Sequence, residues 1–140
     1  MDALRVNRKH IDELLRFLPQ FDSPDIRLDQ AWHGLDSQPN KDGVLTMPSP
    51  AYPPTVTDFF QLAGQPFWSD YEYDSSAAGE LVHSDAAIAS ASLAQIKTML
   101  TFCVRGERFC DGHWGTMIRE GRIAAILRRL SQLREEVPDA

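Results

Sequence analysis

A chain of 140 residues, of which 43% are hydrophobic and 24% charged, has the size and composition of one globular domain. Its formal net charge of -6 argues against broad affinity for nucleic acid, and its longest apolar runs are too short to cross a bilayer. No apolar signal segment follows Met1, and two cysteines seven positions apart are typical of free thiols in a reducing compartment. We therefore expect a cytoplasmic protein without membrane association.

The first part of the chain is predicted to hold one helix and one long loop. Apolar residues at helical spacing indicate an amphipathic N-terminal helix within residues 7–20, with Asn7 as its N-cap and Pro19 close to its end. Residues 22–54 contain six prolines and two glycines, which exclude a long regular element. Their apolar side chains indicate that this Pro-rich loop is packed against the domain, with a short strand at residues 43–47.

The middle of the chain holds a short predicted helix and a segment that the pattern leaves open. Thr55 and Asp58 resemble a capping box, and the apolar residues behind them predict a helix of about two turns. Residues 67–74 alternate with period two, which fits a strand or an ordered loop with aromatic anchors. The acids of this segment do not match a calcium loop, because Ser75 and Leu81 stand where that loop needs Gly and Glu.

Residues 84–135 form a predicted helical region. Apolar residues at helical spacing predict a long helix that ends at Gly106 in a left-handed cap, and the pattern does not decide whether residues 84–91 belong to it. Asp111 is the expected N-cap of the next helix, and Gly121 separates that helix from the last one. The sequence therefore predicts a mainly α fold, a single helical domain with a long packed Pro-rich loop and at most minor β structure.

Charged, aromatic, sulfur, imidazole and glycine residues are densest at residues 101–115, TFCVRGERFCDGHWG. This stretch and the segment behind it resemble a bacterial family of domains of unknown function, through an RGERF motif followed by a glycine and by G-x-I-x-x-x-L-x-R-L. The matching residues are Arg105, Gly106, Glu107, Arg108, Phe109, Gly112, Gly121, Ile123, Leu127, Arg129 and Leu130. The resemblance supplies a hypothesis about the site and implies no activity.

Three kinds of chemistry have some of their residues in this stretch but are disfavoured. Cys103, Cys110 and His113 supply three of the four ligands of a zinc site, so we expect no metal. Cys110 beside His113 has the ingredients of an activated nucleophile, although a thiol packed beside Phe109 is favoured. A DNA-binding helix-turn-helix around Gly121 is disfavoured by the short turn and by the acidic net charge.

The fourth chemistry is anion recognition. Arg105 and Arg108, with the backbone amides at the start of the following helix, have the donors that hold a phosphate or a carboxylate. The favoured structural alternative pairs Arg105 with an acid such as Asp85 or Glu80, and Glu107 with an arginine of the last helix. Both interpretations place ordered arginines at this stretch.

Charge is distributed unevenly along the chain. Residues 105–134 hold seven arginines and three acids, so this segment is basic and the remainder is strongly acidic. The favoured interpretation is that the basic helices pair with acids of the same chain. The alternative is that they offer a face to an anionic partner.

We therefore predict a small cytoplasmic binding or interaction module, without cofactor, whose partner is a protein or a small anionic ligand. The candidate ligand-binding residues are Arg105, Glu107, Arg108, Asp111, His113 and Trp114. One alternative is an enzyme that uses Glu107, Asp111 and His113 as acid/base groups beside Arg105 and Arg108. A second alternative is nucleic-acid binding through the basic C-terminal helices. The sequence assigns no catalytic residue and is compatible with a homodimer.

Overall fold

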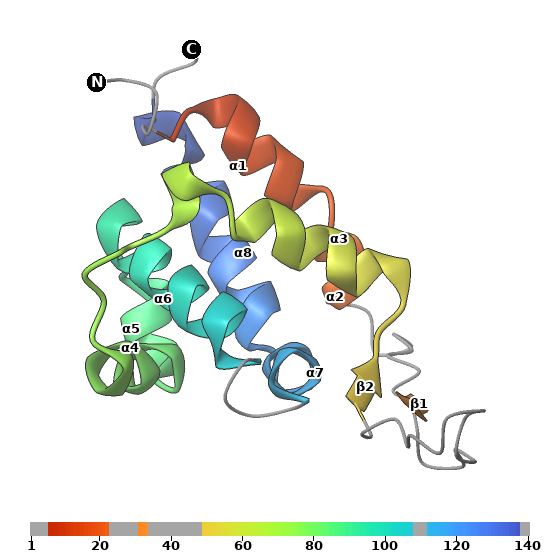
Figure 1. The fold of residues 1–140 in the computed structure, drawn as a ribbon. Helices are drawn as coiled ribbons and strands as arrows, with labels where there is room; N and C mark the ends of the chain where they lie inside the picture. The colour runs from red at the N-terminus through yellow and green to blue at the C-terminus, as the bar shows by residue number, and fades with distance from the viewer. Residues whose placement is uncertain (1–5, 23–30, 34–48, 108–111, 138–140) are drawn as a thin grey trace, which may run out of the picture.

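The structure is a computed structural model that describes residues 6–22, 31–33, 49–107 and 112–137. Within these residues the chain is a mainly helical single domain, as predicted, and its β structure is limited to two short strands (Figure 1). The α-helices are α1 (Arg8–Leu15), α2 (Leu18–Phe21), α3 (Pro54–Ala63), α4 (Ser75–Val82), α5 (Asp85–Ala89), α6 (Leu93–Gly106), α7 (His113–Arg119) and α8 (Arg122–Leu133). The 3-10 helices are η2 (Pro66–Trp68) and η3 (Arg134–Glu136), and the strands are β1 (Ala31–His33) and β2 (Ser49–Ala51).

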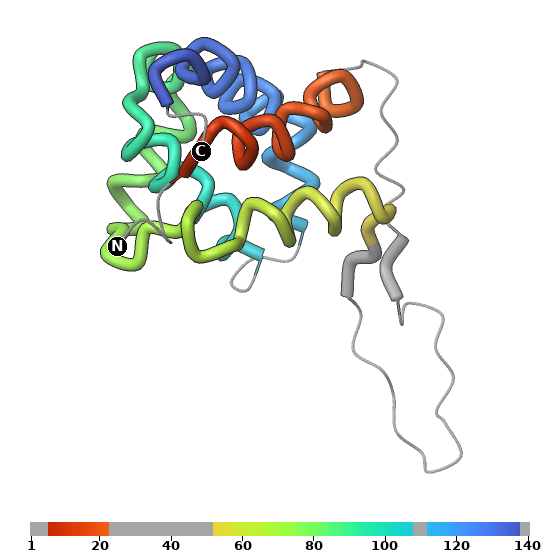
Figure 2. The backbone as a smooth tube through the Cα atoms, turned by 90° about the horizontal axis from the view of Figure 1, so that it is seen from above, coloured from red at the N-terminus to blue at the C-terminus, as the bar shows by residue number. Residues whose placement is uncertain are grey.

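Helix α8 is the central element of the domain. It contacts α1, α2, α5, α6 and α7, and Figures 1 and 2 both show α1 running beside α8 and α3. Four of its side chains are completely shielded from solvent: Ile123, Ile126, Leu127 and Leu130. A helix with one wide apolar face packs that face against the core. The remaining polar edge of α8 lies along α5.

Aromatic side chains join the N-terminal helices to α3. Phe59 packs edge-on against Phe17 and Phe21, with ring centroids 5.5 and 5.1 Å apart. Phe60, the next residue along α3, points the other way and stacks on Trp114 at 4.5 Å with the two rings nearly parallel. Helix α3 therefore packs on the N-terminal helices with one residue and on α7 with the next.

The N-terminal helix is shorter than predicted. Asn7 is the N-cap of α1, as expected, and accepts from the His10 amide while the His10 ring accepts from the Asn7 amide. The chain then turns at residues 16–17 and begins the separate helix α2, in which Pro19 occupies the first turn. Proline is tolerated in the first turn of a helix because its missing N–H has no partner there. Pro19 therefore helps to start a second helix rather than to end the first.

In the middle of the chain one prediction is wrong, and one choice that the sequence left open is decided. Helix α3 begins at Pro54 with Pro53 as its N-cap and without a side-chain cap, so Thr55 and Asp58 do not form a capping box. Residues 67–74 are not a strand, because η2 and a turn occupy them and Trp68 is buried as an aromatic anchor. The open alternative of an ordered loop is the one that the structure takes.

The helical region of the C-terminal half begins earlier than predicted. Helix α4 was not expected; Asp74 caps it by accepting from the Ser76 amide. Residues 84–91 do not continue into α6, because Ser84 caps α5 and Ser92 caps α6. Each of these caps satisfies amides that a helix start leaves without a partner, so the three caps specify three separate helices.

Of the Pro-rich loop, the structure describes residue 22, residues 31–33 and residues 49–54. Strands β1 and β2 pair antiparallel there, with Ala31 opposite Ala51. The strand predicted at residues 43–47 lies outside the described residues. Among the helices that the structure describes, none combines the length and the apolar character needed to span a membrane.

Candidate functional site

The stretch singled out in the sequence forms the junction between α6 and α7, and Glu107 holds the junction together. Its carboxylate accepts three hydrogen bonds: from the Tyr52 hydroxyl at 2.9 Å, the Gly112 amide at 2.9 Å and the Trp114 amide at 2.9 Å. The last two amides belong to the start of α7, where Gly112 is the N-cap residue in left-handed conformation and offers no side chain. Glu107 therefore caps α7 from the end of α6, which is the role that the sequence assigned to Asp111.

Trp114 and His113 are packing residues of the same junction. The Trp114 indole donates to the Val104 carbonyl at 3.0 Å and its ring covers Phe60. The His113 ring lies edge-on to Phe102, with centroids 5.2 Å apart, and an added Cβ at Gly106 would come within 2.3 Å of it. Gly106 is helical rather than left-handed, contrary to the prediction, so glycine is needed there because the imidazole lies against the backbone.

Arg105 turns away from this junction. Its guanidinium lies over the rings of Tyr71 and Tyr73, 5.8 and 5.3 Å from their centroids. The predicted partners were wrong: Arg105 has no ion pair with Asp85 or Glu80 in the described residues, and Glu107 binds amides and a hydroxyl instead of an arginine. The described part of the stretch has a different structural role, because Glu107, His113 and Trp114 all contribute contacts to the α6–α7 junction. Arg108 and Asp111, with Phe109 and Cys110, lie outside the described residues.

Among the described residues, neither a set of metal ligands nor a reactive cysteine is found. No group of three His, Cys, Asp or Glu side chains among them is arranged to hold a metal ion. Cys103 is fully buried in α6, and this burial raises the pKa of its thiol to about 12. A thiol with that pKa is protonated at neutral pH, whereas the nucleophilic form of cysteine is the thiolate.

Stability should fall in mild acid because of His113. Burial lowers the pKa of His113, and this effect exceeds the opposing influence of Glu107 and of the hydrogen bond to the Phe102 backbone, while His83 adds to the lowering. The imidazole Nε2 is buried without a hydrogen-bond partner. As the pH falls, the unfolded chain, with a histidine pKa of about 6.5, takes up the proton first. The stabilisation that neutral His113 gives the folded state is therefore complete above about pH 6.5 and is lost as the pH falls toward the folded-state pKa.

We therefore expect the melting temperature of the parent to drop between about pH 7 and pH 5 more steeply than that of His113→Gln. His83→Gln removes the exposed histidine that adds to this lowering, and it should keep most of the parent's pH dependence because burial of His113, the first cause, remains. If the melting temperatures of the parent and of His113→Gln fall equally over this pH range, His113 is not the cause of the loss of stability in acid.

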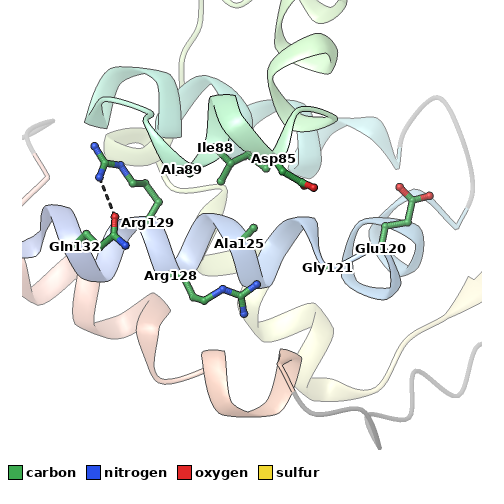
Figure 3. A pocket seen from close by; sticks show the side chains of 9 residues that line it. All are labelled: Asp85, Ile88, Ala89, Glu120, Gly121, Ala125, Arg128, Arg129 and Gln132. Carbon is green, nitrogen blue, oxygen red and sulfur yellow. Dashed lines mark hydrogen bonds between the residues drawn. The ribbon is translucent and has the colours of Figure 1, made fainter.

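A different part of the molecule has the form of a binding site. A pocket of about 410 Å³ lies between α5 and the polar edge of α8 (Figure 3). It is lined by Asp85, Ile88, Ala89, Glu120, Gly121, Ala125, Arg128, Arg129 and Gln132. Among the candidate residues that the structure describes, Arg105, Glu107, His113 and Trp114, none lines it.

Other arginines of α8 and η3 are already paired with acids from distant parts of the chain. Arg122 binds Asp85 of α5 at 2.7 Å, Arg128 binds Asp22 at 2.6 Å, and Arg134 binds Asp12 of α1 at 2.7 Å. The hydrogen bonds from Arg134 hold the pKa of Asp12 below its usual value. These ion pairs confirm for three arginines the interpretation that the basic helices pair with acids of the same chain.

Arg129 is different. Its Nε donates to the Ala91 carbonyl at 2.9 Å and its Nη1 to the Gln132 side-chain oxygen at 2.9 Å, and it has no carboxylate partner in the described part of the chain. An arginine has five N–H donors, so three remain after these two bonds. Arg129 also borders a second hollow of about 400 Å³, on the side where α6 begins. It is a fixed, half-buried cation between two hollows.

The comparison with known proteins gives a family and no activity. A model described as a family of unknown function (DUF6508) matches residues 6–136. The chain belongs to this family. No curated protein and no solved structure matches the chain. The DUF6508 match spans every described helix from α1 to η3, so both the α6–α7 junction and the α5–α8 pocket lie within the family domain.

The sequence did not identify the pocket. Arg129 occurs in the G-x-I-x-x-x-L-x-R-L motif, but as one of several arginines flanking an apolar stripe it gave no sign of being unpaired. Arg129 differs from the other arginines only in lacking a carboxylate partner, and this depends on which acids pair with the others. Those acids lie up to 122 positions away along the chain. The alternative of nucleic-acid binding finds no support in the structure, because α8 is the core helix and only Glu120 and Gly121 separate it from α7.

Proposed function

We propose that this DUF6508 domain is a small binding module whose α5–α8 pocket takes an anionic ligand with an apolar part, and that Arg129 holds the anion. The observation that carries the proposal is that Arg129, unlike the other two arginines of α8, has no carboxylate partner among the described residues. Three of its N–H donors remain for a ligand, and its side chain borders the pocket.

The fixed position of Arg129 favours binding. Its two hydrogen bonds to Ala91 and Gln132 already restrict the side chain, so a ligand does not have to immobilise a flexible group. A guanidinium binds carboxylate and phosphate through charge-assisted hydrogen bonds, which are about twice as strong as neutral ones. Ala89 and Ala125 supply apolar surface next to it, in the manner of small-molecule sites that combine apolar surface with a few polar groups.

We expect octanoate to bind the parent protein with a dissociation constant of about 1 mM or lower, and octanol to bind at least about tenfold more weakly. Arg129→Gln should weaken octanoate binding about tenfold, because the positive charge and the paired N–H donors of the guanidinium are lost together. Arg129→Lys keeps the charge and should retain part of the affinity. The measurement is calorimetric or fluorescence titration at fixed ionic strength.

Arg16→Gln is the control for these variants. Arg16 is an exposed arginine that lies over the Phe17 ring and does not border the pocket. Circular dichroism must show that Arg129→Gln retains the helical fold. The proposal is wrong if Arg129→Gln binds octanoate as tightly as the parent does, or if octanol and octanoate bind equally.

The cellular setting is part of the proposal. We place the module in the bacterial cytoplasm, and the buried free thiol of Cys103 supports a reducing compartment. Fractionation of cells that make the tagged protein tests this placement, and recovery of the protein from the periplasm or the membrane fraction would contradict it.

A further inference from the structure

The two ends of the α5–α8 pocket carry opposite charge. Figure 3 shows Arg129 and Gln132 at one end of the pocket and Glu120 at the other, with Asp85 on the Glu120 side. Ile88 and Ala125 lie between the two ends. Arg128 also lines the pocket, below Ala125 in this view, and its ion pair with Asp22 offsets its charge. The pocket therefore has a cationic end, an apolar middle and an acidic end.

The acidic end keeps an uncompensated negative charge. Arg122 is the shared partner of Asp85, at 2.7 Å, and of Glu120, at 3.8 Å, so one guanidinium serves two carboxylates. The contact to Glu120 is too long for a hydrogen bond, and Arg122 Nε is buried without a hydrogen-bond partner. The Asp85 side chain is 93% exposed and binds Arg122 through one oxygen. Both carboxylates thus retain acceptor sites that face the pocket or the solvent.

The length of α8 sets the spacing between the two ends. Gly121 and Arg129 are eight residues apart, which corresponds to about 12 Å along the helix axis. Figure 3 shows Asp85 between Arg129 and Glu120, so Asp85 is the first acid along the pocket from Arg129. A linear aliphatic chain of several methylene groups bridges a gap of this order, and it would lie against Ile88 and Ala125.

We propose that the ligand of this pocket is a zwitterion, with a carboxylate or phosphate bound by Arg129, an ammonium group bound by Glu120 and Asp85, and an aliphatic stem between them. This inference rests on the proposed function, because it takes the anion to be bound at Arg129. It adds the class of ligand: a molecule with one charge of each sign at its two ends.

The test compares three probes of equal chain length: 8-aminooctanoate, octanoate and octylamine. The parent should bind 8-aminooctanoate about tenfold more tightly than octanoate, since the ammonium group adds charge-assisted hydrogen bonds at the acidic end. Octylamine should bind more weakly than 8-aminooctanoate by a similar factor. If octanoate binds and 8-aminooctanoate binds no more tightly, the zwitterion inference is overturned while the proposed function stands. If none of the probes binds, both are overturned.

Variants of Glu120 and Asp85 test whether the acidic end is the source of the tighter binding of 8-aminooctanoate. Glu120→Gln removes a charge without breaking a hydrogen bond that the structure records, so the fold should be retained. This variant, and the double variant with Asp85→Asn, should lose the preference for 8-aminooctanoate and keep the octanoate affinity within about twofold. Glu80→Gln, which removes an exposed acid from α4, should change neither value. A preference that survives in the double variant would place the ammonium group elsewhere and contradict the inference.

Discussion

Replacement of Glu107 by alanine is expected to lower the free energy of unfolding by about 2–4 kcal/mol. The carboxylate accepts hydrogen bonds from Tyr52, Gly112 and Trp114, and the last two donors are backbone amides at the start of α7. Alanine leaves these amides without their partner and removes a negative charge from the positive end of the helix dipole. Urea denaturation followed by circular dichroism measures the loss.

Two further variants separate the capping role of Glu107 from a general effect of removing an acid. Glu107→Gln keeps an oxygen that accepts hydrogen bonds, so we expect it to recover about half of the loss. Glu80→Ala removes an exposed glutamate from α4 and should change stability by less than about 0.5 kcal/mol. If Glu107→Ala unfolds at the same urea concentration as the parent, Glu107 does not hold the junction.

Replacement of Gly106 by alanine is expected to lower the free energy of unfolding by about 1–3 kcal/mol. Alanine in a helix is ordinarily about 1 kcal/mol more favourable than glycine, so the sign of the effect is informative. Here the new Cβ would lie 2.3 Å from two atoms of the His113 ring, and the ring is confined by Phe102. Steric overlap should therefore outweigh the gain in helix propensity.

The position of the clash provides its own control. In the double variant Gly106→Ala/His113→Ala the ring is gone, so the added methyl group should cost nothing relative to His113→Ala alone. Gly79→Ala, whose Cβ would meet only the Phe102 ring at 3.2 Å, should stay within about 1 kcal/mol of the parent. A Gly106→Ala protein more stable than the parent would show that the ring moves freely and that the junction is not tightly packed.

The sequence was most informative where structure is decided by neighbouring residues. Asn7 was a recognisable cap because a helix start needs a side-chain acceptor next to it in the chain, and Asn7 does cap α1. The buried stripe of α8 follows from the spacing of its apolar residues. These local signals were sufficient to predict a mainly helical domain.

Local signals failed where a distant residue supplies the interaction. Gly106 looked like a helix-ending glycine, but its neighbour in space is His113, and Glu107 caps a helix that begins six positions later. Arg105 was expected to find an acid and lies over two tyrosines instead. The α5–α8 pocket was not predicted at all, because an unpaired arginine can be identified only after all the pairs are known.

The most direct test of where this domain binds is the set of backbone amide shifts in a ¹H–¹⁵N spectrum of the parent during titration with octanoate. We predict that the largest changes occur at residues 85–92 of α5 and its linker and at residues 120–132 along α8, with the amides of Arg105, Glu107, His113 and Trp114 nearly unchanged. Changes concentrated at those four amides, with α5 and α8 unaffected, would show that the α6–α7 junction binds the anion and that the pocket at Arg129 does not.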